Sequence, residues 1–138
     1  IAHVFFFFSI RNQEEANTLI KELRQSGLAT EDMSNNEMAK LHVRHLVGGH
    51  AHDVKNEILY RFEFPDRPGA LMNFLNNMSH NWNISLFHYR NHGADYGRVL
   101  IGIQVPPEEK SDFKAFLNQL GYRYWEETKN PAYKLFLG

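Results

Sequence analysis

The fold of this chain is decided by residues 57–71, which read EILYRFEFPDRPGAL. In the first half of this stretch an apolar residue falls on every second position, as in a strand with one buried face: Ile58, Tyr60, Phe62 and Phe64. Beyond the turn, apolar residues follow the i, i+3, i+4, i+7 spacing of an amphipathic helix: Leu71, Phe74, Leu75 and Met78. The pattern predicts a strand over 57–64, a tight turn and a helix over 68–80.

The turn carries the best chemical feature of the sequence. Pro68 suits the first turn of a helix, where the missing N–H costs nothing and the fixed φ is already near the helical value. Gly69 has no side chain to shield the neighbouring N–H groups. A strand that runs through such a turn into a helix N-terminus makes a corner that accepts an anion. We therefore expect the N–H groups of Gly69 and Ala70 to bind an α-carboxylate.

An apolar wall for the same ligand would come from Leu71 and from the strand expected over 83–91. On that strand, Phe87 and Tyr89 fall on one face. Either Tyr89 or Arg90 would hold the polar end of the ligand, but alternation prevents both from facing one pocket. We prefer Tyr89, because it shares the face of Phe87.

The elements from residue 57 onward define an α+β fold. The strand over 83–91 is followed by a hairpin turn at 91–95 and a returning strand marked by Val99 to Val105. Pro106-Pro107 ends that strand, and a helix with an apolar stripe from Phe113 to Leu120 ends at Gly121. A strand over 122–126 completes the order β-α-β-β-α-β, the ferredoxin-like arrangement with two helices on one face of an antiparallel sheet. One further strand is expected over 132–137.

The N-terminal part reads as other elements of the same kind. Residues 4–10 predict a strand buried on both faces, because consecutive Phe residues fit no exposed element. A helix follows, with Asn12 and Glu15 as its capping box and Gly27 at its end. Residues 28–31 predict a short strand. Ser34 with Glu37 predicts a second capping box and a short helix through Lys40, although a turn followed by a strand fits as well.

The two ends of the chain resemble each other, which indicates an internal repeat. With a shift of 94 residues, Gly27 falls on Gly121 and Asn36 falls on Asn130; with a shift of 95, Val4 falls on Val99. These matches predict that residues 1–44 are the C-terminal half of a first module, 45–56 a linker and 57–138 a complete second module. The other half of the first module is then either cut away or supplied by another chain. A Phe-rich strand without its sheet neighbours favours a homo-oligomer.

Composition excludes several classes of function. Of the 138 residues, 43% are apolar and 22% charged, as in ordinary globular proteins. A net charge of −1 disfavours a nucleic-acid partner. The apolar run from Val4 to Phe8 is far shorter than the ~20 residues of a membrane span. The absence of cysteine excludes disulfides and thiolate chemistry.

Motifs for catalysis or metal binding are weak. No Walker loop, dinucleotide-type glycine run, nucleophile elbow or HExxH helix is present. Histidines gather between residues 42 and 52, but no carboxylate or thiol is placed to complete a tetrahedral site, so plain surface histidines are the better interpretation. An acid–base role for Asp66 and Arg67 is less plausible than a turn cap beside a solvated cation. Polar and aromatic residues that include Arg90, Tyr96 and Arg98 fit cross-strand packing and a ligand or subunit contact equally well.

The stretches 64–71, 82–90, 92–99 and 130–133 resemble the second ACT-like module at the C-terminus of biosynthetic threonine dehydratase. Residues 32–44 resemble the end of the first module and the connection between the two. The resemblance implies an allosteric regulatory domain that binds isoleucine, a feedback inhibitor, and valine, which opposes it. The parent enzyme would be a cytoplasmic, pyridoxal phosphate-dependent lyase that deaminates threonine to 2-oxobutanoate.

This chain lacks the catalytic domain and cofactor lysine motif of that family, so we expect no cofactor and no catalysis from it alone. Its partners would be the effector, the catalytic domain of the parent enzyme and further copies of itself, without nucleic acid, membrane or metal. The expected effector-binding residues are Arg67, Pro68, Gly69, Ala70, Leu71, Phe87 and Tyr89. An oligomerisation module without a ligand is the alternative function.

Overall fold

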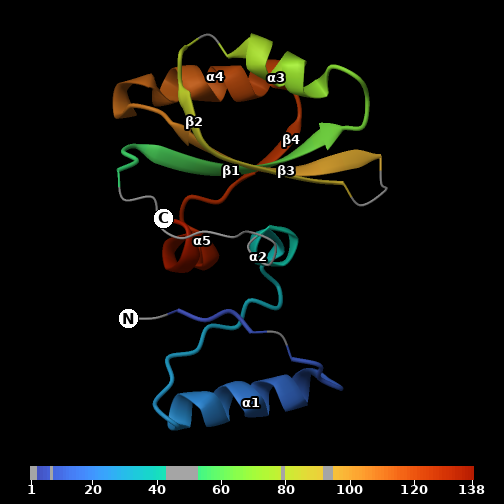
Figure 1. Ribbon diagram of the computed structural model, residues 1–138, viewed down its shortest axis with the longest axis vertical. Helices are drawn as coiled ribbons and strands as arrows, with labels where there is room; N and C mark the ends of the chain where they lie inside the picture. Colours follow the sequence, from blue (N-terminus) through green and yellow to red (C-terminus); the bar gives the residue numbers. More distant parts are fainter. Residues whose placement is uncertain (1–2, 7, 43–52, 79, 92–94) are drawn as a thin grey trace.

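The structure, a computed structural model, describes residues 3–6, 8–42, 53–78, 80–91 and 95–138 (Figure 1). A four-stranded antiparallel sheet lies between two layers of helices. Helices α3 (Ala70–Asn77) and α4 (Lys110–Leu120) cover one face, and the short helices α2 (Glu37–Leu41) and α5 (Pro131–Phe136) lie below the other. The N-terminal segment and α1 (Gln13–Gln25) lie beyond α2 and α5.

The sheet confirms the predicted order of elements. Its strands are β1 (Glu57–Pro65), β2 (Asn83–Asn91), β3 (Tyr96–Gln104) and β4 (Arg123–Glu126), arranged β2-β3-β1-β4. With α3 and α4 they give the order β-α-β-β-α-β, an α+β fold compatible with an ACT-like module. Pro106-Pro107 ends β3 as predicted and leads into a 3₁₀ turn (Pro107–Glu109) before α4. The predicted turn after β2 falls on residues 92–94, which lie outside the described residues.

The main core lies between the sheet and the α3/α4 layer. Alternation along β1 sends Tyr60, Phe62 and Phe64 to this side, and all three are buried. Phe74 of α3 is the hub, because its ring lies 5.3 Å from the rings of Phe62, Phe64 and Phe116. Such aromatic contacts add to the free energy of simple area burial.

Tyr60 makes this core sensitive to alkaline pH. Its burial, and secondarily the charge of Glu126 and the neighbouring Tyr124, raise the pKa of Tyr60 to about 12. Because the pKa is higher in the folded than in the unfolded chain, the neutral phenol contributes stability below pH ~10. That contribution, on the order of 2 kcal/mol, is expected to be lost as the pH rises from ~10 to ~12. Urea titrations of wild type and Tyr60→Phe across this range measure it; an equally steep loss in Tyr60→Phe would contradict the assignment.

A second apolar cluster fills the space between the other sheet face and the α2/α5 layer. Leu59 and Leu100 from the sheet meet residues of the two short helices: Met38, Ala39, Ala132 and Tyr133. Tyr133 donates from its hydroxyl to Glu57 Oε1 at 2.5 Å, and its burial and this bond raise its pKa well above the usual range. Both faces of the sheet are therefore packed against helices.

Residues 131–136 form a helix, so the strand predicted over 132–137 is wrong. Asn130 caps the helix, its Oδ1 accepting from the Ala132 N–H at 2.9 Å, and Pro131 occupies the first helical position. An Asn-Pro pair before an apolar run is itself a helix-start signal. The strand prediction relied on the short apolar run instead of this signal.

The buried strand predicted over 4–10 is also wrong. The described residues of this segment form no strand, and its alternating apolar side chains are exposed: Val4 by 64%, Phe6 by 69%, Phe8 by 57% and Ile10 by 42%. Residues 28–31 form no strand either. A strand needs a hydrogen-bonding neighbour, and the sheet of the described chain lies on the far side of the α2/α5 layer. Phe5 packs inward, with its ring 5.5 Å from that of Phe136.

The helix predicted after this segment is confirmed as α1. Asn12 Oδ1 accepts from the Glu15 N–H at 2.9 Å, while the Glu15 carboxylate accepts from the Arg11 N–H at 2.7 Å. Gly27 ends the helix with φ +85° and a Schellman pair of hydrogen bonds. The short helix through Lys40 is confirmed as α2, but its cap is Asn36 rather than Ser34.

Candidate functional site

The corner between β1 and α3 differs in detail from the predicted one. The helix begins at Ala70, so Pro68 precedes it instead of occupying its first turn. Gly69 is the N-cap residue, with φ +84° and no side chain to satisfy the first N–H groups of the helix. An added Cβ at Gly69 would meet nothing within 4 Å. The mouth of α3 is therefore open on the side where a side chain would otherwise stand.

The predicted helix stripe is rotated relative to the observed one. Ala70 and Phe74 face the core, whereas Leu71 is 43% exposed. Leu71 was expected on the apolar stripe of this helix, but it is not a core residue, and truncating it leaves no buried cavity. Its exposure instead leaves Leu71 available to a ligand at the helix mouth.

Tyr122 holds the first turn of α3 in place, a role that the sequence interpretation missed. Its buried hydroxyl donates to the Ala70 carbonyl at 2.9 Å and accepts from Asn73 Nδ2 at 3.1 Å. The signal was present in the sequence, since Tyr122 directly follows the helix-ending Gly121 and a buried tyrosine hydroxyl needs partners. These two hydrogen bonds hold the first turn of α3 against the residue that precedes β4.

Phe87 and Tyr89 share one face of the sheet, as predicted, and it is the face that α3 and α4 cover. Pairing places them opposite Ile101 and Val99 of β3, whose side chains are in the main core. They remain 43% and 48% exposed, because β2 is the edge strand. The ring of Tyr89 lies over Gly97, where an added Cβ would be 2.5 Å from Tyr89 Cε2. Gly97 thus makes room for the tyrosine ring.

The register brings the parts of the site to one end of the sheet. The last residues of β1 pair with the first residues of β3, and these pair in turn with the last residues of β2. Gly69, Leu71, Phe87 and Tyr89 therefore belong to the same face and the same end, with Arg67 and Pro68 exposed in the turn beside them. The arrangement offers helix N–H groups for a carboxylate beside exposed apolar and aromatic side chains for a hydrocarbon group.

Arg90 belongs to the opposite face of the sheet. It pairs directly with Arg98 of β3, and Arg98 Nη1 lies 2.7 Å from Glu63 Oε1. His88, on the same face, has its Nδ1 at 2.8 Å from His42 Nδ1. The polar-aromatic cluster expected at this hairpin is therefore split between the two faces.

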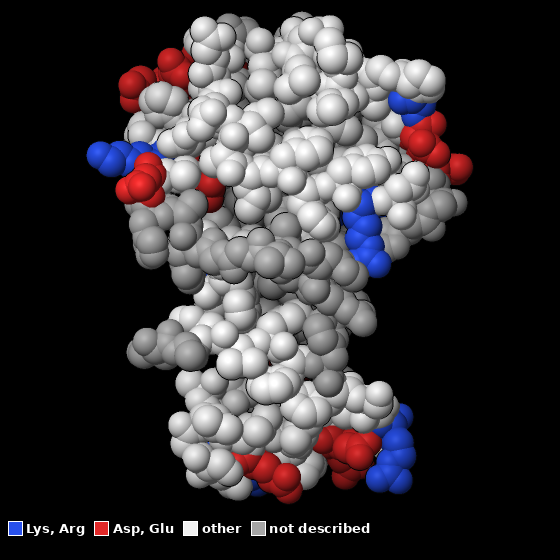
Figure 2. All heavy atoms as spheres, viewed as in Figure 1, with Lys and Arg blue, Asp and Glu red and all other residues white. Residues whose placement is uncertain are grey.

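Metal binding receives no support from the described residues, where no three potential ligands gather. His45, His50 and His52 of the histidine-rich stretch lie outside the described residues. No helix among the described residues is both long enough and apolar enough to cross a membrane. On the face shown in Figure 2, basic and acidic side chains lie near each other at the margins, without a large field of one sign.

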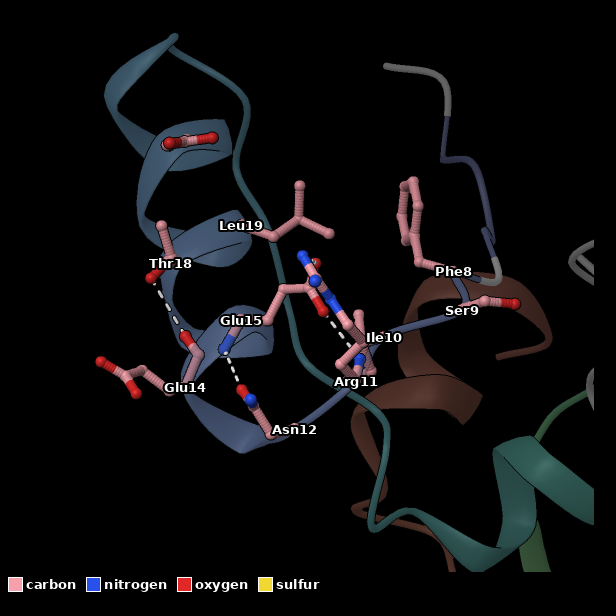
Figure 3. Close-up of a pocket in the computed structure, with 10 residues that line it drawn as sticks. Phe8, Ser9, Ile10, Arg11, Asn12, Glu14, Glu15, Thr18 and Leu19 are labelled. Atoms are coloured by element: carbon pink, nitrogen blue, oxygen red, sulfur yellow. Dashed lines mark hydrogen bonds and ion pairs between the residues drawn. The ribbon is translucent and has the colours of Figure 1, made fainter.

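A pocket of about 590 Å³ lies away from this corner, between residues 8–12 and α1 (Figure 3). Phe8 and Leu19 point toward it from its two sides, and Arg11 reaches Glu15 at 3.5 Å along its rim. Its lining combines the apolar Phe8, Ile10 and Leu19 with polar side chains from residues 9–12 and α1. Because Asn12 and Glu15 in its lining form the cap of α1, we assign no ligand to this pocket.

The fold is an α+β module compatible with an ACT-like fold, and its helix α3 has an open N-terminus. Residues 48–137 match the family described as the C-terminal regulatory domain of threonine dehydratase, and the chain belongs to this family. It is 49% identical over 136 residues to L-threonine dehydratase biosynthetic IlvA of Burkholderia multivorans, and 50% identical over 137 residues to mitochondrial threonine dehydratase of Saccharomyces cerevisiae.

These two matches cover 99% of this chain but only 27% and 24% of the relatives. The Escherichia coli biosynthetic IlvA is 50% identical over 127 residues, which are 92% of this chain and 24% of that protein. The chain thus spans about a quarter of the length of the curated relatives that it matches. The expected family is confirmed.

Proposed function

We propose that this chain is the effector-binding part of a biosynthetic threonine dehydratase, which binds isoleucine as feedback inhibitor and valine as its competitor. Binding here would control deamination of threonine to 2-oxobutanoate by a catalytic domain elsewhere in a cytoplasmic parent enzyme. The observation that carries the proposal is membership of the family of regulatory domains. The open mouth of α3 supports it, because an amino-acid carboxylate is the kind of anion that a helix N-terminus accepts.

Pyridoxal phosphate would belong to that catalytic domain, since the lysines described in this chain do not fit it. A cofactor-binding lysine must be desolvated in a pocket to form a Schiff base. Every lysine whose side chain the structure describes is exposed: Lys21, Lys55, Lys110, Lys114, Lys129 and Lys134. No catalytic step is therefore assigned to these residues.

The proposed ligand position uses the corner described above. The carboxylate would meet the N–H groups at Gly69 and in the first turn of α3, where the Ala70 N–H makes only a long 3.4 Å bond to the Arg67 carbonyl. The branched side chain would lie against Leu71 and Phe87, with Tyr89 toward the polar end. These are the residues expected from the sequence, and their role stays a prediction.

Isoleucine is expected to raise the melting temperature of the purified chain. Ligand at 100 times its Kd adds about 2.7 kcal/mol to the free energy of unfolding, which corresponds to a shift of several degrees. D-isoleucine is the matched control, because it carries the same charges and hydrocarbon in the wrong arrangement. Equal shifts with both enantiomers, or no shift with either, would contradict specific effector binding.

We also infer that residues 1–44 are half of a first ACT-like module. With a shift of 95 residues, the exposed Val4, Phe6, Phe8 and Ile10 match Val99, Ile101, Ile103 and Val105, which are at most 1% exposed. The exposed apolar row thus corresponds in sequence to residues that form the core side of β3 in the complete module, but it lacks the elements that would cover it. A β-α-β unit from beyond these residues, or from a second copy in a homo-oligomer, would cover it.

This row, defined as Val4, Phe6, Phe8 and Ile10, also favours the second candidate function. An exposed apolar row of this kind favours contact with a neighbouring molecule. In this view the chain acts as an oligomerisation module that needs no ligand. A concentration-dependent mass in light scattering, combined with no response to isoleucine, would favour this candidate over effector binding.

A further inference from the structure

Asn36 and Asn130 join the two short helices of the middle layer by a reciprocal pair of hydrogen bonds. Asn36 Nδ2 donates to Asn130 Oδ1 at 2.7 Å, and Asn130 Nδ2 donates to Asn36 Oδ1 at 3.0 Å. Each oxygen also caps its own helix: Asn36 Oδ1 accepts from the Ala39 N–H at 3.0 Å and Asn130 Oδ1 from the Ala132 N–H at 2.9 Å. Both side-chain oxygens thus serve two donors at once.

The two asparagines also end the same kind of turn. The Asn36 N–H donates to the Met33 carbonyl at 3.0 Å, and the Asn130 N–H donates to the Glu127 carbonyl at 2.9 Å. Asn36 and Asn130, like Met33 and Glu127, are 94 residues apart. The turns at 33–36 and 127–130 therefore meet through equivalent side chains. Such a contact is expected when two segments are related by a local two-fold axis.

The pair can form in only one relative orientation of α2 and α5. Apolar side chains of the two helices, including Met38, Ala39 and Tyr133, also meet in one cluster, and such contacts are not directional. Sliding one helix by a turn would separate the amides and leave partly buried polar groups without their partners. Polar pairs set register in coiled coils for the same reason.

The pair is anchored to the sheet through Glu127. Asn130 Nδ2 donates to Glu127 Oε2 at 2.5 Å, and Arg61 Nε donates to Glu127 Oε1 at 3.4 Å. Arg61 lies in β1, is 8% exposed and has its guanidinium 4.2 Å from the centre of the Trp125 ring of β4. A continuous polar route thus leads from the middle of the sheet to the start of α2.

We propose that the Asn36–Asn130 pair is an orientation lock that fixes the N-terminal segment, with α1, relative to the sheet. The apolar contacts of the middle layer hold the two parts together, while the paired amides select one arrangement. Removing the amide donor of Asn36 then allows several arrangements without abolishing contact.

The test is a distance distribution between spin labels on α1 and α4. The chain contains no cysteine, so Glu22→Cys and Lys114→Cys, both at exposed positions, give two unique labelling sites. Asn36→Asp keeps an oxygen for the Ala39 N–H, but it removes the donor to Asn130 and adds a charge near Glu127. Asn12→Asp is the matched control, because it makes the same change at the exposed cap of α1.

One narrow distance is expected for the doubly labelled chain without further substitution and for the same chain with Asn12→Asp. With Asn36→Asp, we expect a distance distribution at least twice as wide, or a second distance. An unchanged narrow distance in Asn36→Asp would overturn the proposal. If Asn36→Asp fails to fold, Asn36→Ser decides, since it keeps a capping oxygen, adds no charge and lacks the amide. A narrow distance in Asn36→Ser would then overturn the proposal, and a broadened one would support it.

Discussion

Replacing Gly69 by Asn is expected to weaken isoleucine binding at least tenfold while leaving the fold intact. An added Cβ at Gly69 enters open space at the mouth of α3, where we place the ligand carboxylate. The amide of Asn would also compete for the first N–H groups of the helix. Asn is the suitable replacement because it tolerates positive φ better than other side chains, and Gly69 has φ +84°.

Gly121→Asn is the matched control for this experiment. Gly121 has φ +74°, and an added Cβ there also meets nothing within 4 Å. The two substitutions therefore impose similar backbone strain, but Gly121 lies at the end of α4. Calorimetric titration with isoleucine should give wild-type affinity for Gly121→Asn only. Equal affinities of the two variants would place the ligand elsewhere.

Truncating Phe74 is expected to be the most destabilising single change described here. Phe74→Ala removes a ring that is 0% exposed and packs against three other aromatic rings. Large-to-small replacements of this kind cost about 3–5 kcal/mol, from lost transfer free energy and from the cavity left behind. Urea unfolding followed by circular dichroism measures the loss.

Phe6→Ala makes the same change at a ring that is 69% exposed. In the monomer it should change the free energy of unfolding by less than about 0.5 kcal/mol. A loss of unfolding free energy similar to that of Phe74→Ala at low protein concentration would show that Phe6 is buried in the monomer. A cost that appears only as the protein concentration rises would instead mean that a second copy covers the exposed row.

Periodic patterns predicted the sheet and its two large helices because burial dictates both. Phe62 and Phe64 alternate in β1, and Phe113 to Leu120 form a stripe in α4, so each element had one apolar face to bury. The N-terminal segment carries an equally strong apolar signal. It failed as a strand because pairing depends on a neighbour that the local sequence does not encode, and the described chain supplies none beside it.

The start of α3, on which the candidate site depends, was predicted in its location but not in its detail. The Pro-Gly turn placed the helix mouth correctly, yet the helix starts two residues after Pro68 and turns Ala70 inward and Leu71 outward. Phe74 and Met78 belong to the buried stripe in both cases, so the stripe moves by less than the roughly 100° that one residue advances. The position of Tyr122 after Gly121 was a signal for a buried hydroxyl, but its partner Ala70 is set by tertiary structure and could not be predicted from the local pattern.

The most direct test of effector binding at the α3 corner is an isoleucine titration followed by the backbone amide signals in a ¹⁵N–¹H correlation spectrum. The account predicts that the largest shifts fall on Gly69, Ala70 and Leu71, with smaller shifts at Phe87 and Tyr89. The amides of Gly27 and Gly121, which share the backbone conformation of Gly69, should stay in place. Saturable shifts confined to residues outside the α3 corner, or no saturable shifts at all, would contradict the account.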